Sequence, residues 1–334
     1  MNGRPSVLEV NGLTTQFSNR QNRAVTVVDG VDFTVKKGET LGIVGESGCG
    51  KSVTSLSIMR LLGKNGRVSG SVRFEGQETL HLSEAEMRKL RGNRMAMIFQ
   101  EPMTSLNPVL TIGRQIGEVL HLHTSLGAEE RKQRVIELLT QVGIPRAKDI
   151  YAEYPHRLSG GMRQRVMIAM AMACQPQLLI ADEPTTALDV TIQAQMLGLI
   201  REMRDNTGMS VMLITHDLGV VAEMCDRVLV MYAGQVIESA DVRTLLRAPK
   251  HPYTMGLIRS VPHRAKGVKR LYAIPGNVPS PGEWPQGCRF APRCSEAMPI
   301  CQQKSPSLLK LDDGSECRCW LHAPDAGTEG SERT

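Results

Sequence analysis

The sequence predicts an α/β protein built on a largely parallel β-sheet that is flanked by helices. In the second half of the chain, short apolar strands at 178–182, 211–215 and 228–232 alternate with helical segments, which is typical of a parallel sheet. An earlier apolar run, residues 41–44, leads directly into a glycine-rich loop and a helix that begins near Lys51. This order of strand, loop and helix is the one in which α/β proteins place an anion-binding loop.

The segments around this core have patterns of their own. Residues 7–36 alternate apolar and polar residues in short strands and predict an antiparallel β layer. A further strand is expected around residues 71–74. Residues 131–142 carry apolar residues at helical spacing, with Gly143 as a stop signal, and belong to a helical insertion. The pair at 233–234, Ala-Gly between two apolar runs, predicts a hairpin turn.

The glycine-rich loop fills the template of a glycine, four variable residues and Gly-Lys-Ser. It consists of Gly45, Glu46, Ser47, Gly48, Cys49, Gly50, Lys51 and Ser52. Its glycines allow consecutive backbone N–H groups to turn toward one anion, while Lys51 can reach the β and γ phosphates and the Ser52 hydroxyl can bind Mg²⁺. The alternative is an unrelated glycine-rich turn. The loop predicts that the chain binds a nucleoside triphosphate.

A second motif is the apolar strand 178–182, which ends in two carboxylates, Asp182 and Glu183. Asp182 is suited to hold Mg²⁺ through water, and Glu183 is suited to orient or deprotonate an attacking water molecule. The alternative is a capped strand followed by a solvated acidic turn. Together with the phosphate loop, the two acids indicate hydrolysis of the bound nucleotide.

A third motif places Ser159, Gly160 and Gly161 at the head of a helical run, residues 162–172. A serine there caps the helix, and its unpaired N–H groups form an anion site. The string LSGGM that contains these residues resembles the LSGGQ signature of the ATP-binding cassette (ABC) family. That resemblance implies that Ser159, Gly160 and Gly161 contact the γ-phosphate of ATP held on the opposite subunit of a dimer.

Four more positions match motifs of this family. Gln100 resembles the Q-loop glutamine, which contacts Mg²⁺ and water and senses the membrane partner. His216 resembles the switch histidine at the γ-phosphate, and Asp189, after Ala187 and Leu188, resembles the D-loop beside the dimer seam. Phe17 occupies the place of the aromatic residue that stacks on adenine. Singly, these could also be turn, cap, structural or core residues.

The resemblance covers residues 7–320 and implies a P-loop NTPase fold. The expected ABC cassette occupies residues 1–250, with a RecA-like parallel-sheet core, an antiparallel β layer and a helical subdomain at about 101–172. Near residue 250 the composition becomes rich in Pro and Cys and helical patterning fades, so residues 251–322 are expected to form a C-terminal extension. The small and polar residues at 323–334 are expected to be disordered.

The extension carries most of the cysteines of the chain. They are Cys288, Cys294, Cys301, Cys317 and Cys319. Clustered cysteines in a cytosolic protein favour a metal over disulfides, but spacings of five and six residues do not fit zinc knuckles. The string resembles the C-terminal extension of oligopeptide and dipeptide importer ATPases. This implies a [4Fe–4S] cluster on Cys288, Cys294, Cys301 and Cys319. Cys319 is the expected fourth ligand because it directly precedes Trp320, and Cys317 is the alternative ligand. Zinc, or reduced thiols in a loose tail, are the other possibilities.

Cys49 stands where these ATPases more often have serine. One hypothesis is that the positive environment of the loop lowers the pKa of its thiol, so that oxidation there would block nucleotide binding.

Composition excludes other classes of protein. At 334 residues the chain fits about two domains. Aromatic residues make up only 4%, and the net charge of +6 is spread along the chain, so no nucleic-acid partner is expected. The longest apolar run, residues 166–174, is far shorter than the roughly 18 residues of a membrane span. The N-terminus has no apolar segment of signal type, and a cytosolic location is therefore expected.

Taken together, the resemblance implies an ATP-binding and hydrolysing subunit of a bacterial inner-membrane ABC importer for dipeptides, oligopeptides or similar small solutes. Its expected cofactors are ATP and Mg²⁺, with the [4Fe–4S] cluster in the extension. Its expected partners are a second ABC ATPase subunit, often a different one, two transmembrane permease subunits and, indirectly, a periplasmic substrate-binding protein. It would lie peripherally on the cytoplasmic face of the inner membrane. ATP would close the pair of ATPases, and hydrolysis would reopen it.

Several alternatives stay open. Dipeptides, longer peptides, glutathione-like conjugates and nickel chelates are all compatible as solutes, because the solute never touches the ATPase. A soluble ABC protein that remodels ribosome or DNA complexes usually carries two cassettes or a long coiled-coil insertion, and neither is visible in this sequence. A phosphotransferase built on the same loop would leave Ser159, Gly160 and Gly161 without a purpose.

Overall fold

The computed structural model of this chain describes residues 4–18, 23–100, 105–185, 189–260 and 272–323. The chain divides into two compact units. Unit 1 comprises Met1–Leu8, Thr34–Thr40 and Arg73–Ile214, and unit 2 comprises Glu9–Phe33, Leu41–Val72 and Thr215–Thr334.

Unit 1 contains three parallel strands. They are β6 (Met95–Ile98), β7 (Leu178–Asp182) and β8 (Ser210–Ile214), paired in the order β6-β7-β8. Every residue of β7 and β8 is buried, which explains why their sequences read as continuous apolar runs rather than as alternating patterns. The prediction of parallel strands near residues 178–182 and 211–215 is confirmed.

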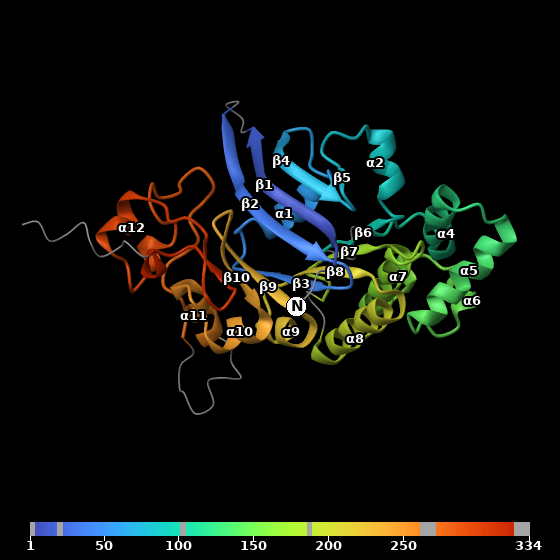
Figure 1. The fold of residues 1–334 in the computed structure, drawn as a ribbon. Helices are drawn as coiled ribbons and strands as arrows, with labels where there is room; N and C mark the ends of the chain where they lie inside the picture. The colour runs from blue at the N-terminus through green and yellow to red at the C-terminus, as the bar shows by residue number, and fades with distance from the viewer. Residues whose placement is uncertain (1–3, 19–22, 101–104, 186–188, 261–271, 324–334) are drawn as a thin grey trace, which may run out of the picture. The chain divides into compact units, whose positions relative to one another are not determined.

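Helices make up most of the rest of unit 1 (Figure 1). They are α2 (Glu84–Leu90), α4 (Ile112–His123), α5 (Ala128–Gln141), α6 (Ala147–Ile150), α7 (Gly160–Ala171) and α8 (Val190–Thr207), with the 3₁₀ turn η1 (Pro155–Arg157). Helix α5 buries Val135, Leu138 and Leu139, the apolar stripe that predicted it, and ends before Gly143, whose φ is 73°. Helices α4, α5 and α7 pack against one another.

The predicted β layer near the N-terminus is present. It is formed by β1 (Ser6–Ser18), β2 (Ala24–Lys36) and β4 (Gly66–Phe74), in the order β2-β1-β4. Most of these three strands lies in unit 2. The last residues of β4, in unit 1, pair antiparallel with the short strand β5 (Gln77–Glu78).

A second sheet of unit 2 begins with β3 (Thr40–Val44), which runs parallel to β9 (Arg227–Tyr232). Strand β10 (Gln235–Asp241) folds back antiparallel on β9. Ala233 and Gly234 join them with φ of 43° and 82°, the positive values that a type I′ turn needs at both central residues, so the predicted hairpin is confirmed.

The C-terminal part of the chain adds two strands to this sheet, which the sequence analysis did not predict. Strand β12 (Glu316–Cys317) pairs antiparallel with β10, and β11 (Leu309–Lys310) pairs with β12. Two-residue strands are too short to leave an alternating pattern in a sequence.

The helices of unit 2 are α1 (Lys51–Ile58), α9 (Leu218–Met224), α10 (Val242–Arg247), α11 (Pro252–Arg259) and α12 (Pro299–Gln303), with the 3₁₀ turns η3 (Ala291–Arg293) and η4 (Trp320–His322). The alternative of thiols in a loose tail does not hold for the described residues, because Cys301, Cys317 and Cys319 are buried within regular elements or directly beside them. Residues 324–334, where disorder was predicted, lie outside the described part of the chain.

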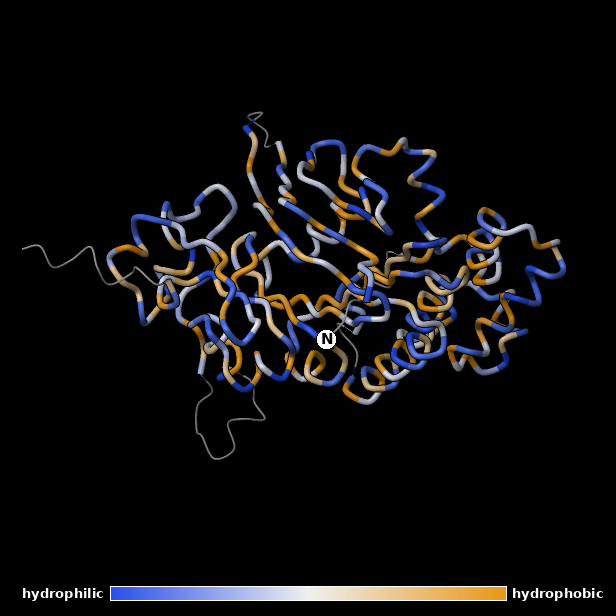
Figure 2. The backbone as a smooth tube through the Cα atoms, viewed as in Figure 1, coloured by the Kyte–Doolittle hydropathy of each residue, from blue (hydrophilic) through white to orange (hydrophobic). Residues whose placement is uncertain are grey.

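Hydrophobic residues are concentrated in the strands, whereas helices such as α5 carry hydrophilic residues on one side (Figure 2). All five residues of β3 are buried, and burial of such apolar surface is the main favourable term in folding. Within the described ranges, no helix combines the length and the apolar character that a bilayer-spanning segment requires.

An aromatic cluster in unit 2 joins the end of β9 to the C-terminal region. The rings of Tyr232, Tyr253 and Phe290 meet edge to face, with centroids 4.8 to 5.4 Å apart, and His251 packs 5.6 Å from Phe290. His251 begins helix α11, where its Nδ1 accepts the N–H of Tyr253. The buried carboxylate of Glu238 accepts the N–H of His251, at 2.9 Å.

Burial of His251, together with the nearby His322, lowers the pKa of its imidazole to about 3. The unfolded chain therefore takes up this proton near pH 6.5, whereas the folded protein does not, and stability must fall as the pH drops from about 6.5 toward 3. The expected contribution is up to about 1.4 kcal/mol for each pH unit.

The variant His251→Asn tests this, since an amide oxygen can still accept the N–H of Tyr253 but does not titrate. Thermal unfolding between pH 8 and pH 4 should show a lower Tm at pH 8 but a shallower loss toward acid than in the wild type. Parallel Tm curves for the two proteins would refute this assignment.

Candidate functional site

The phosphate loop lies in unit 2 between the buried strand β3 and helix α1. Lys51, the first residue of α1, is only 5% exposed. Its ammonium donates to the carbonyls of Gly45, at 2.8 Å, and Glu46, at 3.2 Å. These contacts fold the lysine side chain back along the loop, so that its charge lies beside the backbone that the motif predicts to bind phosphate.

Two glycines of the loop are required by its geometry. Gly45 has a φ of 155°, and a Cβ there would lie 2.3 Å from the carbonyl oxygen of Met231. Gly50 caps α1 with a φ of 104°, in the left-handed region that other residues rarely adopt. The template glycines at these positions are therefore explained by close packing at Gly45 and by backbone conformation at Gly50.

The acidic pair lies in unit 1, at the end of β7. Asp182 is 4% exposed and closes the strand, and Glu183 follows it with a φ of 46°. Its backbone N–H donates to the carbonyl of Ile214. A non-glycine residue in the left-handed region stores strain, and such strain clusters at functional sites.

The structure brings Gln100 to this pair from 83 residues away. Its amide Nε2 donates to Oε2 of Glu183 at 3.0 Å. Two residues that the motifs predicted separately thus meet in unit 1. A glutamine amide at this position holds the carboxylate in one orientation, as an arrangement that positions a water molecule requires.

The signature motif also lies in unit 1. Ser159 caps helix α7, where its hydroxyl accepts the N–H of Met162 at 3.3 Å. Ser159 and Gly160 are exposed, and a Cβ at Gly160 would meet no atom within 4 Å. The predicted cap is confirmed, and the helix N-terminus faces open space where an anion from outside the subunit can approach.

The remaining predicted residues are placed as follows. His216, in unit 2, is exposed in the turn that Asp217 caps by accepting two N–H groups of α9. Asp189, in unit 1, caps α8 by accepting the N–H of Ile192 at 2.9 Å. Phe17, in β1, is half-buried. Ala187 and Leu188 of the predicted D-loop lie outside the described residues.

The hypothesis of an activated Cys49 is wrong. Its thiol is fully buried, and burial raises its pKa, although the charge of Lys51 acts in the opposite direction. Desolvation penalises a thiolate more than one nearby ammonium stabilises it. Cys49 therefore acts as a small buried packing residue, and its sulfur would lie 2.7 Å from a Cβ at Gly45.

Contacts from the C-terminal region to the phosphate loop were missed by the sequence analysis. Arg293 donates to both carboxylate oxygens of Glu46, at 2.7 and 3.0 Å. The hydroxyl of Tyr253 accepts the N–H of Glu46 at 2.8 Å. No spacing in the sequence joins residues so far apart, and the two arginines between Cys288 and Cys294, Arg289 and Arg293, do not indicate their partners.

Four of the five clustered cysteines lie near one another. Electrostatic interactions link Cys319 to Cys288, Cys294 and Cys301, and burial together with these neighbours raises the pKa of Cys319 to about 11. Cys317 instead interacts with Glu238 and Cys319. These interactions do not set Cys317 apart from the four predicted ligands, and among the described residues no group of three or more His, Cys, Asp or Glu side chains is arranged to hold a metal ion.

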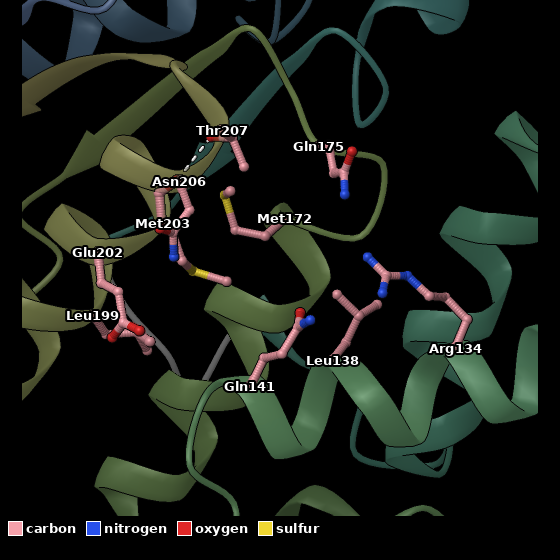
Figure 3. A pocket seen from close by; sticks show the side chains of 10 residues that line it. All are labelled: Arg134, Leu138, Gln141, Met172, Gln175, Leu199, Glu202, Met203, Asn206 and Thr207. Carbon is pink, nitrogen blue, oxygen red and sulfur yellow. Dashed lines mark hydrogen bonds between the residues drawn. The ribbon is translucent and has the colours of Figure 1, made fainter.

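Unit 1 also contains a cavity of about 350 Å³ that lies outside these motifs (Figure 3). Helices α5 and α8 supply most of its lining, including Leu138 and Met203 together with Arg134 and Glu202, and Met172 lies at the end of α7. It contains none of the predicted site residues.

Comparison with known proteins identifies the family. A family model described as ABC transporter matches residues 28–186, and one described as the C-terminal region of oligopeptide/dipeptide transporters matches residues 237–301. Among solved structures, the fold is similar to the dimeric structure of a post-hydrolysis state of the ATP-binding cassette MJ0796 bound to ADP and Pi. The TM-score is 0.64 and the identity 27%, with 71% of this chain and 99% of that chain covered.

Curated relatives match nearly the whole length. The chain is 54% identical over 331 residues to the oligopeptide transport ATP-binding protein AppD of Bacillus subtilis, covering 98% of this chain and 99% of the relative. It is also 54% identical over 317 residues to the probable peptide ABC transporter ATP-binding protein y4tR of Sinorhizobium fredii, covering 94% of each. The chain therefore belongs to the ABC transporter family, as an ATP-binding-cassette ATPase that carries the C-terminal region of oligopeptide/dipeptide transporters.

Proposed function

We propose that this ATPase powers a bacterial importer of dipeptides, oligopeptides or similar small solutes. The observation that carries the proposal is the combination, in one chain, of the phosphate loop and the signature helix with the C-terminal region found in oligopeptide/dipeptide transporters. The names of the relatives, which are peptide transport proteins, support the same solute class. Glutathione-like conjugates and nickel chelates are the neighbouring solutes that an uptake assay must include.

In this proposal the phosphate loop binds ATP through its backbone N–H groups and Lys51. Ser52, Asp182 and Gln100 hold the Mg²⁺ that accompanies the nucleotide, and Phe17 stacks on adenine. The buried position of Lys51 supports its role, because a charge-assisted hydrogen bond to phosphate, about 1.5 to 3 kcal/mol, is strongest where water is excluded.

Hydrolysis depends on Glu183, which orients or deprotonates the attacking water. Gln100 positions its carboxylate, as the hydrogen bond between the two side chains supports. His216 contacts the γ-phosphate and stabilises the charge that develops there.

The complete site requires two ATPase subunits. ATP on one subunit meets Ser159, Gly160 and Gly161 of the other, and Asp189 lines the seam. The exposure of Ser159 and Gly160 supports this arrangement. The second subunit is a homologous ABC ATPase, and the pair is a heterodimer in this proposal. ATP closes the pair, and hydrolysis reopens it.

The wider assembly contains two transmembrane permease subunits and, indirectly, a periplasmic substrate-binding protein. The ATPase then lies peripherally on the cytoplasmic face of the inner membrane. Residues 1–250 form the cassette, with its helical subdomain at about 101–172, and residues 251–322 form the C-terminal extension, most of which the model of the oligopeptide/dipeptide transporter C-terminal region matches.

The extension is proposed to carry a [4Fe–4S] cluster on Cys288, Cys294, Cys301 and Cys319. The resemblance of this cysteine string to the C-terminal extension of oligopeptide and dipeptide importer ATPases supports the choice of ligands, and thiolates are the usual protein ligands of iron–sulfur clusters. Closure of the ligand set would require the thiols to move from their described positions and to lose their protons.

The function is tested by purifying the chain from its native membranes and identifying the proteins that accompany it. The wild type should purify with two membrane subunits and show ATP hydrolysis stimulated by peptide and its binding protein.

Glu183→Gln should keep both ATP binding and the membrane partners, but slow turnover by about 10² to 10⁴, the usual contribution of a general base. Purification of the wild type with ribosomes or DNA instead of permeases would favour a soluble remodelling ATPase. Near-normal hydrolysis by Glu183→Gln would show that Glu183 does not orient or deprotonate the attacking water.

The seam is tested at Gly160, where a side chain has room within the subunit. Gly160→Asp should fold and bind ATP, but should abolish ATP-dependent pairing and reduce hydrolysis at least about 100-fold, because a carboxylate would face the γ-phosphate across the seam. Gly198→Asp is the matched control, since Gly198 is also an exposed helical glycine with open space around its Cα. Sedimentation with ATP reads the pairing. Normal ATP-dependent pairing of Gly160→Asp would refute the proposal that ATP on one subunit contacts Gly160 of the other.

The cluster is tested by iron and acid-labile sulfide on anaerobically purified protein. Wild type and Cys317→Ser should contain iron and sulfide in equal amounts, whereas Cys319→Ser should lose most of both, because a serine hydroxyl is a poor ligand for iron. Zinc without sulfide in the wild type, or no metal at all, would refute the cluster.

A further inference from the structure

Glu46, the second residue of the phosphate loop, is held at three points within unit 2. Its N–H donates to the hydroxyl of Tyr253, and its carbonyl accepts the ammonium of Lys51. Its carboxylate accepts two hydrogen bonds from Arg293, at 2.7 and 3.0 Å. Glu46 therefore links the lysine that is to bind phosphate with a side chain of the cysteine-rich region.

Arg293 is rigidly placed. Its side chain is only 4% exposed, against 32% for Glu46. Its Nε donates to the carbonyl of Pro275 at 2.8 Å, and its guanidinium lies 5.7 Å from the ring centre of Tyr232 and 6.0 Å from that of Phe290. A buried guanidinium is costly unless a carboxylate compensates its charge, and a bidentate pair also fixes the geometry of both partners. The loop is thus anchored to a fixed point.

A second arginine of the same region acts near the other end of the loop. Arg289 pairs with Asp29 and donates to the carbonyl of Ala233 at 2.6 Å. The next residue of that hairpin turn, Gly234, donates its N–H to the carbonyl of Cys49. The cysteine-rich region therefore reaches the loop directly at Glu46 and, through the hairpin turn, at Cys49.

We propose that Arg293 is a positioning residue for nucleotide binding. Through its pair with Glu46 it holds the first half of the phosphate loop in the conformation that presents Lys51 and the loop amides to the phosphates. A glycine-rich loop loses much conformational freedom when it orders, and a loop that is already ordered loses less on binding. The C-terminal region thereby sets the affinity for ATP. This inference rests on the proposed ATP-binding role of the loop.

A purely structural pair would give a different result. It would lower the Tm without changing the affinity for nucleotide of the protein that remains folded. A positioning pair raises the Kd and the KM for ATP while kcat changes little, because the groups that carry hydrolysis are untouched.

The experiment measures the Kd of a fluorescent ATP analogue, together with KM and kcat, for the full-length protein below its Tm. Arg293→Gln and Glu46→Gln should each raise Kd and KM on the order of tenfold, with kcat within about twofold. Arg293→Lys should restore part of the affinity, since it keeps the charge but loses the bidentate geometry. The Kd of the double variant should be no higher than that of the single variant with the higher Kd, because both changes remove the same interaction.

Arg318→Gln is the matched control. Arg318 is also a partly buried arginine of the C-terminal region and interacts electrostatically with Asp29, but its side-chain hydrogen bonds go to the carbonyls of Val236 and Pro306 and none goes to Glu46. Its loss should lower the Tm and leave the Kd unchanged.

A wild-type Kd in Arg293→Gln, or an equal rise in Arg318→Gln, would overturn the proposal. If Arg293→Gln does not fold, Glu46→Gln and Arg293→Lys decide, and wild-type affinity in both would overturn it. Absence of ATP binding by the wild type would instead refute the proposed function itself.

Discussion

The phosphate loop works only if its backbone N–H groups stay turned toward one anion, and the rest of unit 2 maintains this constraint. The loop carbonyls of Gly45 and Glu46 are occupied by Lys51, and the N–H and carboxylate of Glu46 are occupied by Tyr253 and Arg293. With these groups paired elsewhere, the remaining amides are the ones available to a phosphate. In the proposed function, hydrogen bonds within unit 2 therefore determine which loop groups are left to face the phosphate.

The residues proposed for catalysis depend on a different constraint, in unit 1. Parallel strands place their carboxyl ends at one edge of a sheet, and β7 ends there in Asp182 and Glu183. The turn after β7 forces Glu183 into a left-handed backbone, and Gln100, which follows β6, reaches its carboxylate. Neighbouring strands thus bring an amide and a carboxylate that are far apart in sequence within hydrogen-bonding distance of each other.

Burial changes the acidity and the contacts of side chains that stand out in the sequence as candidate functional residues. Cys49 sits in a positively charged motif, yet desolvation makes it a weaker acid. In the C-terminal region, a folded layer of short helices and strands buries three of the cysteines and encloses Arg293 between aromatic rings and a carboxylate. The C-terminal region therefore packs against the phosphate loop.

The sequence alone determined the local features that are formed by consecutive residues. These are the loop at 45–52, the cap at Ser159, the strand and acids at 178–183 and the hairpin at 233–234. Each follows from local backbone geometry and from the spacing of a few side chains. Tertiary structure decided the rest: the pairing of β12 with β10, the burial of Cys49, and the contact between Glu46 and Arg293 across 247 residues. The entropic cost of closing a loop rises by only about 0.6 kcal/mol for each doubling of its length, so pairings across other long loops were similarly accessible to the chain. Packing of the whole fold, which leaves no periodic trace in a sequence, selected among them.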